Sequence, residues 1–349
     1  MRIASLEVIP YALPFREPYV TARGRLDRRE MVLLRLRDEQ GLIGLGEAVP
    51  LSLRGGAALA EVVAELEGLE QLDTLDEEGI AGGGLSAPGR CAALTALLDL
   101  RGRRAAGGVD GLAAAPEAAE PEPVRCNATL VAGEPAAVAA DAERWAEGGF
   151  STFKLKVGAG EDVAQVRAVR EALGPDVRIR IDANGAWDVE TARRMLTELE
   201  PLDIELAEQP AATLEELRDL AGTTSIPIAG DESVESRADA ERAAEAGACA
   251  LAGIKLSKVG GPEEAIAIAE VLPSYLSSAL DGPVGIAAAA QVAQSLRAVG
   301  LAHGLATQRL FSSTVAAVEC ELKDGFLHPP AGPGLGVEID EAALDAHRL

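Results

Sequence analysis

Two lysines alternate with apolar residues in the segment TFKLKV, residues 152–157. In a β-strand, residues two apart point to the same side of the sheet. Lys154 and Lys156 would therefore project together from one face, while the apolar residues between and beside them cover the other. A pair of this kind is usual on a solvated edge strand. Here the strand has the composition of a buried one, so the pattern predicts two ammonium groups directed at one place.

Acidic residues end the next three predicted strands. Asp182 ends RIRID, Glu208 ends IELAE 26 residues later, and Asp231 follows PIAG after another 23. Lys255, in GIKLS, comes 24 residues after that. A single aspartate at a strand end is most often a helix cap or a turn former. Successive strands that all end in compatible side chains, about one strand and helix apart, instead predict a shared site.

The chemistry of such a site follows from its charges. Three neighbouring carboxylates repel one another unless a cation joins them, and oxygen ligands of this kind suit Mg²⁺, with Mn²⁺ as the alternative. A lysine beside a metal and a second ammonium should have a lowered pKa, as a general base requires. The pattern predicts removal of the proton α to a substrate carboxylate, with the metal holding the carboxylate and stabilising the enediolate.

These side chains meet only if parallel strands end at one edge. From about residue 124, short apolar segments alternate with amphipathic helical ones, giving eight strands over about 190 residues. This pattern predicts an α/β fold with a TIM-like barrel over residues 122–312. A doubly wound open sheet is the competing architecture, but the glycine-rich dinucleotide turn expected after its first strand is missing from the sequence.

The two chain ends have a different pattern. Residues 1–48 alternate as antiparallel strands, and residues 57–105 carry apolar side chains at helical spacing. A linker rich in Gly, Ala and Pro follows. Short strands and turns return after residue 310. We expect an N-terminal unit over residues 1–115 and a C-terminal segment, residues 313–349, that returns to it.

Composition narrows the class of protein. The net charge of −24 excludes nucleic acid and anionic membranes as partners held by general electrostatics. The N-terminus lacks the shape of a signal peptide, and no apolar run reaches the length of a membrane helix. Four cysteines without a CxxC pair predict buried free thiols. We expect a soluble cytoplasmic protein that binds a small-molecule carboxylate; a homo-oligomer is among the states left open.

A series of motifs runs nearly from end to end: GLIGLGEAVPLSLRGG, KLK, RIDANGAW, EQP, AGDES, IKLSKVGG and GPGLGVEID. In this order they resemble the enolase superfamily, specifically its muconate-lactonizing-enzyme subgroup. The resemblance implies a (β/α)7β barrel covered by an α+β capping domain formed by both chain ends. It implies three Mg²⁺ ligands, namely Asp182, Glu208 and Asp231. It also implies that Lys156 and Lys255 are acid/base residues on opposite faces of the substrate, with Lys154 supporting Lys156 and the substrate carboxylate.

The subgroup shares this machinery among several reactions. The run SSALD…GIAAA and the segment NATL resemble o-succinylbenzoate synthases, which act in menaquinone biosynthesis. EAVPLSLRGG and the tail PAGPGLGVEID resemble dipeptide epimerases, N-succinylamino acid racemases and muconate cycloisomerases. We expect the synthase reaction, with epimerisation or cycloisomerisation as alternatives. A catalytically silent barrel used as a binding module is the alternative of another class.

Five residues are candidates for substrate contact. Ser277 and Ser278, with the backbone NH groups that follow, suit a succinyl carboxylate. Asn184 lies just beyond a predicted ligand, and Arg23 and Arg54 lie in cap loops, where each would meet a distal carboxylate or form an ion pair within the protein.

Two further residues belong to the same strands. Arg180 shares a face with Asp182 and is expected to be an inward ion-pair partner of a carboxylate. His303 lies on the last predicted strand, where pocket lining and packing are equally expected.

Overall fold

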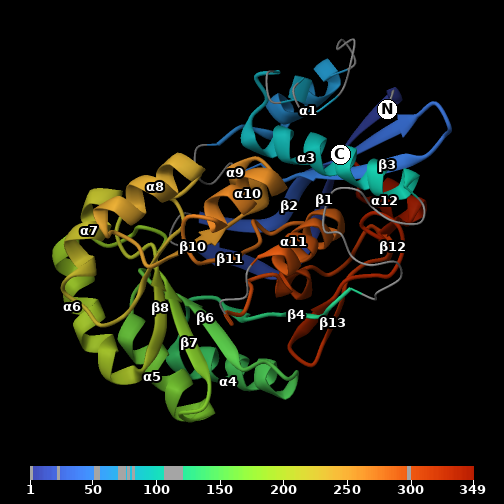
Figure 1. The fold of residues 1–349 in the computed structure, drawn as a ribbon. Coiled ribbons are helices and arrows are strands. Elements are labelled where there is room, and N and C mark those ends of the chain that lie inside the picture. The colour runs from blue at the N-terminus through green and yellow to red at the C-terminus, as the bar shows by residue number, and fades with distance from the viewer. Residues whose placement is uncertain are drawn as a thin grey trace.

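In the computed structural model, a sheet-and-helix cap lies over a barrel of parallel strands, and both chain ends lie on the cap side (Figure 1). The structure describes residues 3–21, 24–50, 56–69, 76, 79–80, 83–105, 121–296 and 300–349.

The barrel is built on a seven-stranded parallel sheet in sequential order. Its strands are β5 (Ala128–Leu130), β6 (Thr152–Lys156), β7 (Arg178–Asp182), β8 (Ile204–Glu208), β9 (Ile228–Gly230), β10 (Leu251–Ile254) and β11 (Ser274–Leu276). An eighth segment joins the two edges, because His303 forms a parallel bridge with Cys126 and Gly304 forms one with Ser277. The predicted TIM-like barrel is therefore confirmed, although its last strand is reduced to these two bridges.

Helices follow the strands and lie outside the barrel (Figure 1). They are α4 (Pro135–Glu147), α5 (Asp162–Leu173), α6 (Val189–Leu199), α7 (Leu214–Ala221), α8 (Arg237–Ala246), α10 (Pro262–Ala269) and α11 (Pro283–Ser295). The short helix α9 (Leu256–Val259) is instead buried between the barrel and the cap. Local sequence fixes several of their ends. Asp188 caps α6 by accepting a hydrogen bond from the Thr191 NH at 2.7 Å, and Gly247 ends α8 at a φ of 63°.

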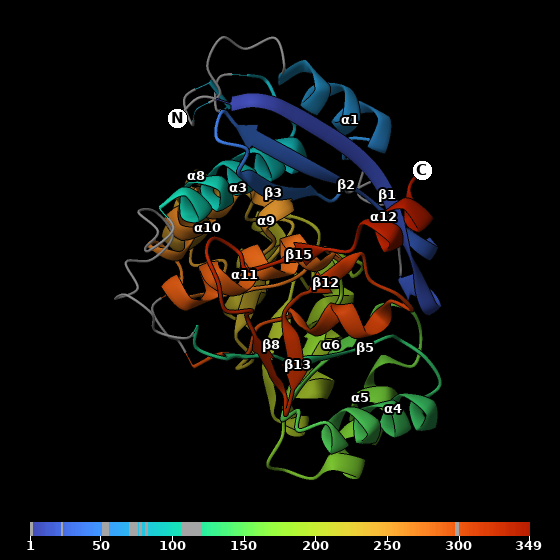
Figure 2. The same cartoon turned by 90° about the vertical axis from the view of Figure 1, so that its right-hand side faces the viewer.

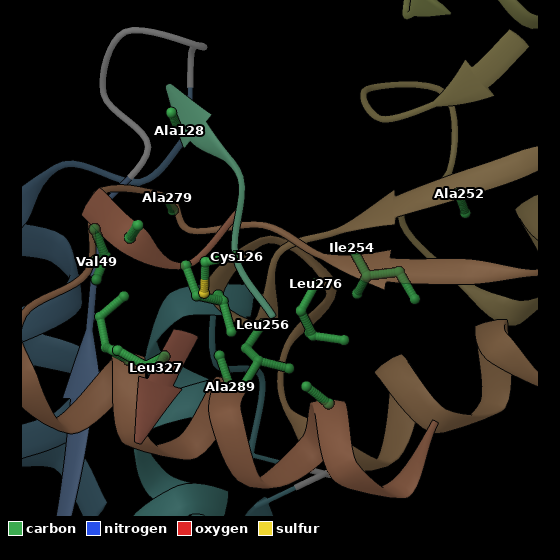
Figure 3. Packing of buried hydrophobic residues seen from close by; sticks show 14 of the residues in the cluster. Val49, Cys126, Ala128, Ala252, Ile254, Leu256, Leu276, Ala279, Ala289 and Leu327 are labelled. Atoms are coloured by element: carbon green, nitrogen blue, oxygen red, sulfur yellow. The ribbon is translucent and has the colours of Figure 1, made fainter. Parts of the chain in front are cut away.

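The alternation in β6 has the consequence predicted for it. Phe153 and Leu155 are buried in one apolar cluster with Val166 and Val169 of α5. Successive residues point to opposite sides of a strand, so the two lysines face the barrel interior. Figure 3 shows another part of this cluster, in which Ile254 and Leu276 lie near one another.

Within the part of the chain that the structure describes, the cap is a three-stranded antiparallel sheet covered by helices. Its elements are β1 (Ile3–Thr21), β2 (Gly24–Asp38), β3 (Ile43–Ala48), α1 (Leu59–Gly68) and α3 (Ala87–Arg104). Both faces of β2 are covered: Met31 and Leu33 belong to the barrel-side cluster, whereas Val32 and Leu34 belong to the cluster under the helices. At Gly46 a Cβ would lie 1.9 Å from the Ala92 carbonyl oxygen, so only glycine lets α3 approach the sheet this closely.

The C-terminal segment runs beside both parts. Its elements are β12 (Ala316–Val318), β13 (Glu321–Lys323), β14 (Phe326–His328), β15 (Glu338–Ile339) and α12 (Glu341–His347). β14 pairs with β4 (Val124–Arg125) at the start of the barrel. The Leu349 NH donates to the Pro10 carbonyl at 3.0 Å, which ties the chain end to β1. Figure 2 shows this segment passing next to the cap sheet, with α11 on the near side of the barrel.

Two predictions from composition concern the whole chain. All four cysteines are buried and free, as predicted. Among the described residues, every helix is too short or too polar to span a lipid bilayer.

Candidate active site

The barrel mouth, where the strands end, carries the three predicted carboxylates. Asp182 and Glu208 are the last residues of β7 and β8 and are paired in register, and Lys156 pairs with Asp182 on the other side. Asp231 directly follows β9. All three acids are fully buried, at 0% exposure. We call them, with the four lysines described next, the mouth cluster: Lys154, Lys156, Asp182, Glu208, Asp231, Lys255 and Lys258.

Lys154 joins two of the acids. Its Nζ lies 2.6 Å from Glu208 Oε2 and 2.9 Å from Asp182 Oδ2. Burial alone would lower the pKa of Lys154, but the charges of Asp182 and Glu208 outweigh this effect and raise it well above its ordinary value. Lys154 therefore stays charged and holds the two acids together, while its support of Lys156 and the substrate carboxylate stays a prediction.

Lys156 lies nearest to open space among the four lysines. Its side chain is 12% exposed, against 2–7% for the others. The ammonium contacts Asp182 Oδ2 at 2.5 Å and Asn184 Oδ1 at 2.9 Å. Burial works to lower the pKa of Lys156, and Asp182 raises it by more, so the net direction is upward. The sequence predicted a lowered pKa for Lys156, on the assumption that a metal ion lies beside it. Here the neighbour that dominates is the Asp182 carboxylate, which raises the pKa instead.

Asp231 is paired with lysines on two sides. Lys255 donates to Oδ2, and Lys258 donates to Oδ1 at 2.7 Å and to the Asp231 carbonyl. Lys258 was given no role from the sequence, although it lies in the quoted motif IKLSKVGG. A usable signal was present: the chain has only five lysines among 32 basic residues. Four of those five lie in the mouth cluster, each in contact with one of its acids.

The three acids also act on one another. Burial would raise the pKa of Asp182, and Lys154 and Lys156 hold it well below its ordinary value, while the Asp231 charge works against them. No three acidic, histidine or cysteine side chains of the described residues coordinate a common point as they stand, since ammonium groups lie against the carboxylates. One oxygen differs: Glu208 Oε1 is buried and makes no hydrogen bond within the described chain. Carboxylates with such an oxygen fit an oxygen-preferring dication.

Asn184 belongs to the same site. It adopts a left-handed backbone conformation, with φ at 48°, which asparagine tolerates better than most residues. Its side chain accepts from Lys156 and donates to Glu232 Oε1 at 3.2 Å. Its NH donates to Asp182 Oδ1 at 2.9 Å. The predicted substrate-contact residue is therefore at the mouth, next to the predicted base.

The two serines make their hydrogen bonds within the protein, and their contact with substrate stays a prediction. The Ser278 hydroxyl donates to Asp281 Oδ2 at 2.7 Å and accepts from Thr307 at 2.8 Å. The Ala279 NH also donates to Asp281. Ser277 is buried beside Gly304 at the barrel closure. The hydroxyl and the following NH that were expected to meet a succinyl carboxylate are thus engaged within the protein, because Asp281 draws the turn onto itself.

Arg23 and Arg54, the two arginines predicted in cap loops, lie outside the described residues.

Arg180 and His303 act in the barrel interior. Arg180 is fully buried and pairs with Glu205, as expected of an inward ion-pair partner. His303 Nδ1 accepts a hydrogen bond from the Leu276 NH at 3.0 Å. Burial and the Arg180 charge lower the pKa of His303 to about 4, so the ring is neutral and contributes to closing the barrel.

A second group of buried acids lies between cap and barrel. We call it the interface cluster: Tyr11, Glu47 and Asp281. The Tyr11 hydroxyl donates to Glu47 Oε2 at 2.7 Å, and the Gly282 NH at the start of α11 donates to Oε1 at 2.6 Å. Burial and the nearby Asp281 raise the pKa of Glu47 to about 7. Sequence analysis missed this cluster, although Glu47 lies in the quoted motif GLGEAVP.

Comparison with known proteins shows the family to which the chain belongs. A sequence model described as enolase C-terminal domain-like matches residues 137–343. The chain belongs to the enolase superfamily. It is 44% identical over 214 residues to an o-succinylbenzoate synthase of Thermobifida fusca, an alignment that covers 58% of this chain and 68% of the synthase.

Solved structures of this superfamily superpose on the whole chain. A muconate lactonizing enzyme of Pseudomonas fluorescens complexed with muconolactone has a TM-score of 0.90 at 27% identity, and the match covers 100% and 99% of the two chains. A dipeptide epimerase of Enterococcus faecalis complexed with Mg and the dipeptide L-Leu-L-Tyr has a TM-score of 0.87 at 26% identity, covering 97% and 100%. The enolase-superfamily chain is thus an enzyme similar to lyases and epimerases alike.

Proposed function

We propose that this chain is a Mg²⁺-dependent enzyme that removes the proton α to a carboxylate, and that its reaction is the dehydration that forms o-succinylbenzoate. One observation carries the proposal: Lys156 and Lys255 each contact a different member of three buried acids that end neighbouring barrel strands. Two acid/base groups on opposite flanks of one metal-ligand set are what proton transfer next to a carboxylate requires.

Asp182, Glu208 and Asp231 are the residues that would hold the cation. When bound, Mg²⁺ would supply positive charge that stabilises the substrate carboxylate as it gains electron density. Mn²⁺, also an oxygen-binding dication, is expected to substitute for it.

Lys156 is the proposed base because its side chain is the most exposed of the four lysines in the mouth cluster. Lys156 must be neutral to accept a proton. A cation bound to Asp182 would offset the carboxylate charge and so lower the pKa of Lys156, which Asp182 alone raises. Its neutral Nζ then takes the α proton of the cyclohexadiene carboxylate, and the C–H bonding pair moves toward the carboxylate. The protonated Nζ returns that proton to the departing hydroxide, so that water and an aromatic ring form.

Lys255 lies on the opposite flank, paired with Asp231. In the dehydration it stays protonated and faces the ring as a cation. In an epimerase or racemase the same lysine would deliver a proton to the face opposite Lys156. The dehydration is supported by the 44% identity to the synthase, while whole-chain similarity to epimerases and muconate lactonizing enzymes supports the alternatives.

Incubation with Mg²⁺ in D₂O separates these functions. We expect o-succinylbenzoate from the hydroxylated cyclohexadiene precursor and no deuterium at the α carbon of dipeptides or N-succinylamino acids. Deuterium at that carbon in both stereoisomers would replace the synthase assignment by an epimerase or racemase, and turnover of cis,cis-muconate would replace it by a cycloisomerase. If no acid exchanges or reacts, the barrel is a binding module. A cytoplasmic location and a homo-oligomeric state stay predictions.

A further inference from the structure

A tyrosine crosses the barrel interior beneath the mouth cluster. Tyr275, on β11, is fully buried, and its hydroxyl donates to Glu208 Oε2 on β8. Gly253, on β10, pairs in register with Tyr275. A Cβ at Gly253 would lie 3.0 Å from the Tyr275 hydroxyl oxygen and 3.2 Å from Cζ. The glycine thus leaves the room that the ring needs to reach across to Glu208.

A second contact, with Arg180, also restrains the Tyr275 ring. The Arg180 guanidinium lies 5.0 Å from the centre of the Tyr275 ring, in cation–π geometry. Arg180 is held in turn by Glu205 and by the Ala302 carbonyl, at 2.7 Å. A fully buried ring held this way has few conformations open to it, so its hydroxyl is offered at one place.

The two oxygens of Glu208 are used unequally. Oε2 accepts from both Lys154, at 2.6 Å, and Tyr275. Oε1 is buried and has no hydrogen bond within the described chain. Two donors from different strands on one oxygen fix the rotation of the carboxylate. Glu208 Oε1, which neither donor contacts, is therefore the oxygen that can coordinate a cation.

We propose that Tyr275 is a positioning residue for the metal site: its hydroxyl fixes the Glu208 carboxylate so that Oε1 is presented to a divalent cation. This inference rests on the proposed function. It assigns to Tyr275 an effect on cation affinity, which a residue that only fills the barrel core would not have.

Tyr275→Phe tests the proposal, because it removes one oxygen and keeps the ring over Arg180. Tyr11→Phe is the matched control, since it removes the same atom from another fully buried tyrosine that donates to a glutamate. Calorimetric titration of the full chain with MgCl₂, without substrate, is expected to give a 10- to 100-fold weaker Kd for Tyr275→Phe. Tyr11→Phe is expected to bind within about twofold of the wild type while unfolding more easily.

A second measurement concerns rescue. If Tyr275 acts through cation binding, turnover by Tyr275→Phe at low MgCl₂ falls with the occupancy and recovers to within a few-fold at saturating MgCl₂. A loss of turnover that saturating MgCl₂ leaves unchanged, with an unaltered Kd, would overturn the inference and leave the proposed function standing. A wild-type chain that neither binds Mg²⁺ nor exchanges any α proton would instead remove the proposed function, and the inference with it.

Gly253→Ala provides an alternative test of the proposal if the Tyr275→Phe variant does not fold. This variant keeps the hydroxyl but crowds it from β10. We expect weaker Mg²⁺ binding from Gly253→Ala, and a Kd equal to that of the wild type would overturn the proposal.

Discussion

The mouth cluster and the interface cluster both bury carboxyl groups, but they shift the pKa of these groups in opposite directions. In the mouth cluster every acid has a lysine in contact, and the pKa of Asp182 is held below its ordinary value. In the interface cluster, Glu47 is held by neutral donors, Tyr11 and backbone NH groups, and its pKa rises to about 7. Burial is common to both, so the neighbours decide the charge.

The difference separates the purposes of the two clusters. In the mouth cluster the acids stay ionised and can bind a cation, and the lysines stay charged and can contact an anionic substrate. Burying so many charged groups is unfavourable because they lose their hydration. The interface acid needs no permanent charge, because its work is to accept hydrogen bonds that join β3 to the start of α11. Substitutions that remove a charge should therefore act strongly in one cluster and weakly in the other.

Replacing the proposed base should produce the largest change. Lys156→Met is expected to lower kcat by about 10²- to 10⁴-fold, because the α proton loses its acceptor. Lys323→Met is the control, since Lys323 is the one lysine outside the mouth cluster and is exposed on β13. Steady-state kinetics of the reaction identified in D₂O provide the measurement. Equal rates for the two variants would remove Lys156 from the mechanism.

Neutral isosteres compare the clusters directly. Asp231→Asn removes the charge that both Lys255 and Lys258 face, and is expected to cost about 3–5 kcal/mol in the free energy of unfolding. Glu47→Gln keeps one acceptor oxygen for the Gly282 and Gly285 NH groups, while its NH₂ group can donate to the Tyr11 hydroxyl oxygen, and it is expected to cost about 1 kcal/mol or less at pH 7. Urea denaturation measures both. Equal costs would contradict the distinction between the clusters.

The titration of Glu47 should be visible in the pH dependence of the free energy of unfolding. Between pH 4.5 and 7 the unfolded chain loses the Glu47 proton while the folded chain keeps it. The free energy of unfolding should therefore fall by roughly 3 kcal/mol as pH rises through this window, and level off above it. Asp182 acts in the other direction: its stabilising charge is present above pH 3.8 and is lost as pH falls below that value. Urea titrations from pH 4 to 8 test the Glu47 effect, and their extension below pH 3.8 tests that of Asp182.

Glu47→Gln is the variant that isolates the effect, since it cannot titrate. The difference between wild type and variant should follow the same window, and a difference independent of pH would show that Glu47 keeps an ordinary pKa in the fold.

The smallest change concerns Ser278, which was predicted from sequence to bind substrate. If its hydroxyl only links Asp281 and Thr307, Ser278→Ala should cost about 1 kcal/mol of stability and leave KM within about twofold. A tenfold rise in KM with unchanged stability would support the sequence prediction and bring the interface cluster into contact with substrate.

The alternating strand and helix pattern, together with the order of acids and lysines, was sufficient to predict the barrel and the residues that gather at its mouth, apart from Lys258. Strand parity alone directed Lys154 and Lys156 inward, and the spacing of about one strand and helix put Asp182, Glu208 and Asp231 on neighbouring strands. Periodicity carries this information because it is local, and because a parallel barrel places every strand end at one edge.

Tertiary structure decided which side chains touch. Tyr275 reaches Glu208 from 67 residues away, and Glu47 meets Gly282 across 235 residues, and no local pattern encodes such contacts. The direction in which a buried group titrates depends on the charges packed against it, as Asp182 and Glu47 show. The sequence determined which groups could do the chemistry; only their packing determined which groups are charged and which are held in place.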